Sequence, residues 1–140
     1  MDDQQRLEAI SESLSIPRVK HHIIMCADQS NPRCAPSEET NELWRYLKAR
    51  LKEAGLSSAP PHWQGDMTIE PDEVEAGTGR VLRTKADCLR ICEQGAIAVV
   101  YPDGTWYAGL NKERIDRIID EHLSEGRPVE EISFAVGDLS

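Results

Sequence analysis

The sequence predicts a two-layer α/β domain in which helices pack on a sheet of about four strands. Short apolar runs rich in β-branched residues, typical of buried strands, alternate with two amphipathic segments that have the period of a helix. Their order along the chain is strand, helix, strand, hairpin, helix. A length of 140 residues fits one domain of this kind.

Three segments have the character of strands. Residues 21–25, His-His-Ile-Ile-Met, contain a β-branched core and end at Cys26. A second strand is expected at residues 80–84, and the continuously apolar run at 96–101 suits a central strand. The turn formers and aromatic residues at 102–107 follow this run directly, so we predict a hairpin.

Two segments have helical periodicity. From Ser37 to Ala54 leucines recur every four residues after two acids in the first turn, and Gly55 closes the segment. Asn111 is suited to cap a second helix. The inward stripe of that helix is predicted to consist of Ile115, Ile118, Ile119 and Leu123.

The remaining segments are polar. We expect residues 1–19 to form a polar leader with a turn or two of helix, and residues 20–140 to form the domain. Proline and acidic residues without any Lys or Arg predict an irregular acidic insertion at about residues 58–79, with a short strand near residues 67–69. We expect this insertion to be a solvated loop or a docking element.

Charge and composition exclude several classes of function. A net charge of −9 opposes binding to nucleic acid or to anionic membranes, and it favours a basic-surfaced partner protein. No apolar run is long enough to span a bilayer, and the N-terminus lacks the pattern of a secretory signal. We therefore expect a cytoplasmic protein, in which cysteines serve metal or redox chemistry and not disulfides.

The four cysteines form two unequal pairs. Seven residues separate Cys26 from Cys34, and three separate Cys88 from Cys92. Four thiolates can hold either structural zinc or an iron–sulfur cluster, although zinc usually takes pairs spaced two to four residues apart. The two-residue spacing of a thioredoxin-type redox motif is absent.

The predicted topology brings these cysteines together. If the first two strands are parallel, a right-handed crossover places their carboxyl ends side by side at one edge of the sheet. Cys26 and Cys88 both lie at or just beyond such ends, while Cys34 and Cys92 would join them from a loop and a turn. His21 and His22 precede Cys26 and offer a Rieske-like alternative, but with four cysteines available we expect them at the strand start or the surface.

The order of these motifs also resembles that of the thioredoxin-like [2Fe-2S] ferredoxins of the Shethna type, from about residue 21 to residue 129. The resemblance is strongest in the second cysteine pair with its following glycine, CLRICEQG at 88–95, and in the hairpin VVYPDGTWY at 99–107. The segment GRPV at 126–129 adds to it. One departure is that Arg90 and Ile91 stand where the family usually has Gly-Arg.

The resemblance implies a thioredoxin-like fold, a homodimer, and one [2Fe-2S] cluster near the surface. The implied cluster ligands are Cys26, Cys34, Cys88 and Cys92. Trp106 and Tyr107 are expected in the core or an interface rather than on an electron-transfer surface.

We therefore expect a one-electron carrier that passes electrons between redox partner proteins and is not an enzyme. No nucleophile with its base and no phosphate-binding glycine loop is recognisable in the chain. A redox-sensing or regulatory iron–sulfur module and a one-cluster subunit of a larger oxidoreductase remain alternative functions.

Overall fold

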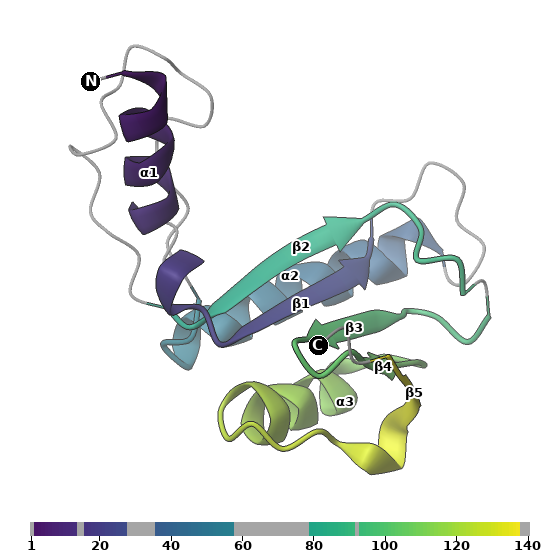
Figure 1. Ribbon diagram of the computed structural model, residues 1–140. Helices are drawn as coiled ribbons and strands as arrows, with labels where there is room; N and C mark the ends of the chain where they lie inside the picture. Colours follow the sequence, from purple (N-terminus) through teal and green to yellow (C-terminus); the bar gives the residue numbers. More distant parts are fainter. Residues whose placement is uncertain (1, 14–15, 28–35, 58–78, 92, 138–140) are drawn as a thin grey trace.

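The computed structural model describes residues 2–13, 16–27, 36–57, 79–91 and 93–137. Within these residues the chain forms a twisted sheet with the two long helical segments packed against it (Figure 1). The predicted two-layer α/β class is confirmed. Among the described residues no helix is long and apolar enough to cross a membrane.

The sheet of the described residues has five strands in the order β2-β1-β3-β4-β5, where about four were expected. β1 is parallel to β2, which meets the condition set for the convergence of the cysteines, and antiparallel to β3, and the remaining pairs are antiparallel. The strand bounds are His21–Cys26 for β1, Val81–Ala86 for β2, Ala98–Tyr101 for β3, Thr105–Tyr107 for β4 and Ser133–Val136 for β5.

The strand that the sequence did not indicate is β5, because its side chains carry little signal of burial. Three of its four residues are exposed, so the strand lacks the alternation of buried and exposed residues by which a strand is recognised in a sequence. The strand exists because its backbone pairs with β4 at the edge of the sheet, where Trp106 lies opposite Ala135.

The helix α2, Ser37–Glu53, matches the predicted segment to within one residue. Its first turn carries two acids and its last turn two bases, which suits the helix dipole. Gly55 then takes a positive φ of 70°, a conformation that favours glycine, and ends the helical path. The backbone oxygen of Leu56 accepts hydrogen bonds from Arg80 N–H at 2.9 Å and Val81 N–H at 3.0 Å, so the end of α2 is tied to the start of β2.

The second helical segment begins as predicted at Asn111. The Asn111 Oδ1 atom accepts a hydrogen bond from Arg114 N–H at 2.8 Å and caps α3, Lys112–Arg117. The path then widens into a π-helical segment, η3, Ile118–Leu123, after which Ser124 N–H donates to the oxygen of Ile119 at 2.9 Å.

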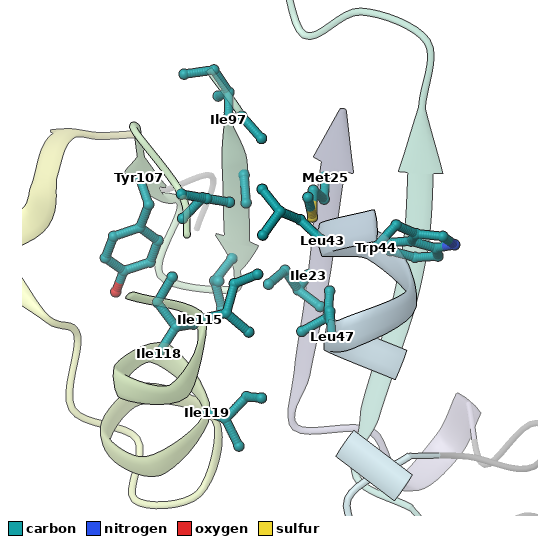
Figure 2. Packing of buried hydrophobic residues seen from close by; sticks show 14 of the residues in the cluster. Ile23, Met25, Leu43, Trp44, Leu47, Ile97, Tyr107, Ile115, Ile118 and Ile119 are labelled. Carbon is teal, nitrogen blue, oxygen red and sulfur yellow. The ribbon is translucent and has the colours of Figure 1, made fainter. Parts of the chain in front are cut away.

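Both helical segments cover the same face of the sheet. Ile23 and Met25 of β1 alternate with outward residues and lie opposite Val100 and Ala98 of β3. Figure 2 shows leucines from α2 and isoleucines from α3 and η3 pointing into this layer. The residues that meet there and are almost fully buried include Ile23, Met25, Leu47, Leu51, Ile115, Ile118 and Ile119.

A carboxylate joins the two helices above this core. Asp116 of α3 accepts hydrogen bonds from Tyr46 Oη at 2.7 Å and from Arg50 Nε at 2.9 Å, both on α2. The Arg50 and Tyr46 hydrogen bonds hold the pKa of Asp116 below its ordinary value, although burial opposes the shift. Asp116 is therefore charged at neutral pH and fixes the spacing of the helices.

The polar leader contains the helix α1, Asp3–Ser13, followed by the short 3-10 helix η1, Ile16–Arg18. Figure 1 shows α1 standing apart from the sheet, and its Leu7 side chain is 59% exposed. The prediction of one or two helical turns there underestimated the helix. The acidic insertion at about 58–79, with its strand near 67–69, lies outside the described residues except for Gly79.

We expect Leu47→Ala to lower the free energy of unfolding by about 2–5 kcal/mol, because it opens a cavity at a side chain that is 1% exposed. Urea titration followed by circular dichroism measures this loss. The matched control is Arg45→Ala on the exposed side of the same helix, which should change stability by less than about 0.5 kcal/mol. Equal losses in the two variants would contradict the assigned packing face.

Candidate metal centre

Cys26 is the last residue of β1 and lies under the surface of the domain. Its side chain is 2% exposed, and it exchanges two hydrogen bonds with Ile97 in the segment that leads into β3. Cys26 N–H donates to the Ile97 oxygen at 3.0 Å, and Ile97 N–H donates to Cys26 Sγ at 3.2 Å. Ile97 thus holds both the backbone and the sulfur of Cys26.

Cys88 lies two residues beyond the end of β2 and is exposed. Its Sγ atom accepts a hydrogen bond from Arg90 N–H at 3.3 Å. Arg90 has a positive φ of 73°, which is unfavourable for a residue with a side chain. Arg90 adopts this conformation in the turn where its backbone N–H donates to the Cys88 sulfur.

The topology brings Cys26 and Cys88 to one edge of the sheet, as predicted. Cys26 pairs in register with Ala86 across the parallel β1–β2 ladder, and Ala27 N–H donates to the Ala86 oxygen at 3.0 Å. Parallel neighbours lie about 4.8 Å apart, and Cys88 follows two residues after Ala86, the residue paired with Cys26. Cys34 and Cys92 lie outside the described residues, and their part in the site stays a prediction.

The segment after the second cysteine pair is anchored to the chain that follows β4. The Gln94 oxygen accepts a hydrogen bond from Gly109 N–H, and the Ala96 oxygen accepts one from Leu110 N–H at 3.2 Å. Ala96 and Ile97 are fully buried. The backbone that holds the Cys26 sulfur is therefore part of the core.

This arrangement suits thiolate ligands of a metal. Both described sulfurs accept backbone N–H donors, the kind of hydrogen bond that commonly supports a metal-bound thiolate. One of them is buried and the other exposed, so a metal bound between them would touch both the core and the solvent. The arrangement can hold a redox metal close to the surface, as electron exchange between proteins requires.

The two histidines of β1 are not ligands of this centre. His21 begins the strand that Cys26 ends, and five residue steps of about 3.3 Å put roughly 17 Å between them. The expected strand-start position is confirmed. His22 Nε2 hydrogen-bonds to Thr84 Oγ1 on β2 at 2.7 Å, whereas His21 lies beside Asp103 and His122.

The hairpin aromatics have different surroundings. Tyr107 is fully buried, and burial raises the pKa of its phenol to about 12. Its oxygen accepts a hydrogen bond from Val129 N–H at 3.0 Å and lies 2.7 Å from His122 Nδ1. The core position expected for Tyr107 is confirmed. Trp106 is half-buried on the opposite face, near the ring of Phe134.

Comparison with known proteins agrees with this fold. The chain is 41% identical over 54 residues to a 2Fe-2S ferredoxin of Aquifex aeolicus and 33% identical over 57 residues to one of Clostridium pasteurianum. These matches span 39% and 41% of this chain, and 49% and 56% of the two relatives, about half of their length. No protein-family model matches the chain.

A solved thioredoxin-like [2Fe-2S] ferredoxin from Aquifex aeolicus superposes with a TM-score of 0.58. The superposition covers 86% of this chain and 94% of that structure at 22% identity, which establishes a shared fold. The fold is that of the thioredoxin-like ferredoxins. The resemblance predicted from the sequence motifs is confirmed, by the curated relatives for the sequence and by the solved structure for the architecture.

Proposed function

We propose that this chain is an electron carrier that holds one [2Fe-2S] cluster through Cys26, Cys34, Cys88 and Cys92. The observation that best supports the proposal is the meeting of Cys26 and Cys88 at one sheet edge, each with a backbone N–H on its sulfur. The names of the curated relatives support the type of cluster.

When bound, the cluster would accept and release one electron between two charge states. The residues of the chain would set how easily this happens. The N–H groups of Ile97 and Arg90 stabilise negative charge on the two sulfurs and so favour the reduced state. The guanidinium of Arg90, two residues from both Cys88 and Cys92, acts in the same direction. The net charge of −9 opposes the added electron.

The two sulfurs differ in burial, and this difference indicates the side on which electrons would enter and leave the cluster. Cys26 lies in the core, whereas Cys88 is exposed. An electron would therefore enter and leave on the side of Cys88. A partner that covers this side would meet Ile91 as well, which is 39% exposed beside the second cysteine pair.

We further propose that the chain acts in the cytoplasm as a homodimer without an enzymatic reaction of its own. Its partner would be a redox protein with a basic surface, because the overall acidity would speed the encounter of the two. The proposal favours a freestanding carrier over a regulatory module, since the exposed position of Cys88 suits brief contact with a partner.

Protein purified without oxygen should be brown and contain two irons and two sulfides per chain, the content of a [2Fe-2S] cluster. Iron and acid-labile sulfide analysis with an absorption spectrum measures this. Replacing any one of the four cysteines with serine should change the spectrum or remove the cluster. The control Glu93→Gln, in the same turn, should preserve it. A colourless protein that binds zinc at the cysteines would overturn the proposal.

The charge of Arg90 should raise the midpoint potential of the cluster. Arg90→Ala is expected to lower the potential by an amount on the order of tens of millivolts, because it removes one positive charge near the sulfurs. Spectroelectrochemical titration measures the shift. Arg90→Lys keeps the charge and should stay close to the parent value, and a fall of the same size in both variants would refute the electrostatic explanation.

Electron transfer to a basic reductase should slow by about tenfold or more as salt is raised from low to high concentration, because screening weakens the attraction between the two proteins. Stopped-flow measurement of the second-order rate tests this. A small neutral oxidant supplies the control, since its rate should hardly change. A salt-independent rate with the protein partner would rule out electrostatic docking.

A further inference from the structure

Three residues from distant parts of the chain form a second group of potential metal ligands, at the end of β1 opposite to Cys26. His21 begins β1, Asp103 lies in the turn between β3 and β4, and His122 belongs to η3. One ring nitrogen of each histidine and one oxygen of Asp103 lie within 4.8 Å of one another.

His122 is held in place from both sides. Its side chain is fully buried, with Nδ1 at 2.7 Å from Tyr107 Oη and Nε2 at 2.6 Å from Asp103 Oδ2. Val129 N–H donates to the same Tyr107 oxygen at 3.0 Å. A hydrogen-bonded second nitrogen is the usual support of a metal-binding histidine, because it fixes the plane of the ring.

His21 contributes the second imidazole of the group, and its ring is partly buried. Its Nδ1 atom is buried and has no hydrogen-bond partner within the part of the chain that the structure describes. The ring lies edge-on to that of His122, with 5.3 Å between the centroids. A buried ring nitrogen without a partner is costly in free energy, so this position favours a ligand that uses it.

The charge states also suit a cation. Burial, and then the proximity of His122, lower the pKa of His21, while Asp103 opposes the shift. His21 is therefore neutral at neutral pH, which is the form that binds metals. Asp103 supplies the one negative charge of the group.

We propose that His21, Asp103 and His122 form a binding site for one divalent cation of the zinc class. Two imidazoles and one carboxylate are a common ligand set for zinc, and they leave a fourth position for water. The Asp103 side chain is 39% exposed, so the carboxylate end of the group is in contact with solvent.

Binding requires only small movements. Ligands around tetrahedral zinc, with bonds of about 2.0–2.2 Å, stand roughly 3.3–3.5 Å apart. His122 Nε2 and Asp103 Oδ2 would separate slightly from 2.6 Å, and the more distant ligand atoms would close in. A metal-bound Nε2 carries no proton, so the His122 ring then holds its remaining proton on Nδ1, which faces Tyr107 Oη. A proton that Nε2 shares with Asp103 before binding either moves to Nδ1 or leaves to solvent.

The site is independent of the cysteine centre. His21 and Cys26 are the two ends of β1, roughly 17 Å apart. A metal here would tie the start of β1 to the hairpin turn and to η3, whereas Cys26 stands at the opposite end of the strand. The proposal therefore stands whether or not the cysteines hold an iron–sulfur cluster.

The test uses the full chain as purified, with whatever occupies its cysteines left in place. After weakly bound metals are removed by dialysis against a chelator, titration with Zn²⁺ should give one additional zinc per chain by elemental analysis. The X-ray absorption spectrum at the zinc edge should show nitrogen and oxygen at about 2.0–2.1 Å and no sulfur at about 2.3 Å. Thermal unfolding should shift upward with zinc.

Variants at the two neighbouring histidines sharpen the test. His21→Ala should lose this zinc and its thermal shift, and Asp103→Asn should weaken both. His22→Ala, next to it on the other face of β1, should keep them. An unchanged circular dichroism spectrum shows that each variant is folded. No additional zinc in the parent protein, equal binding by His21→Ala, or a sulfur shell around the zinc would overturn the proposal.

Discussion

The parallel pairing of β1 with β2 is the constraint on which the cysteine centre depends. Two parallel strands end at the same edge of a sheet, so residues 62 positions apart, Cys26 and Cys88, become neighbours without any direct bond between them. The crossover through α2 makes this pairing possible, and the burial of the leucines of that helix holds it. The crossover through α2 thus both builds the core and brings the ends of β1 and β2 to the same edge.

Backbone N–H groups contact both described cysteine sulfurs at this edge. The Ile97 amide that contacts Cys26 belongs to a fully buried residue, and the Arg90 amide that contacts Cys88 belongs to a strained turn. Side chains in such positions can vary while the hydrogen bonds remain. The hydrogen bond from Arg90 N–H to Cys88 Sγ therefore does not depend on which side chain stands at this position.

The sequence predicted those elements that depend on residues close to one another along the chain. The leucine period of α2, the Asn111 cap and the hairpin each involve residues close in sequence, and each is found as expected. The edge strand β5 was missed because its pairing partner, not its own side chains, makes it a strand. The group of His21, Asp103 and His122 was missed because no spacing rule relates three residues that only the tertiary fold brings together.

The hydrogen bonds from Arg80 and Val81 to Leu56 close the connection between α2 and β2 at its base. Val81 pairs with His21, so this closure lies at the end of the sheet away from Cys26. A segment whose two attachment points already touch can gain or lose residues at small entropic cost. Insertions of different length between α2 and β2 are therefore compatible with an unchanged position of Cys26 and of the end of β2 that precedes Cys88.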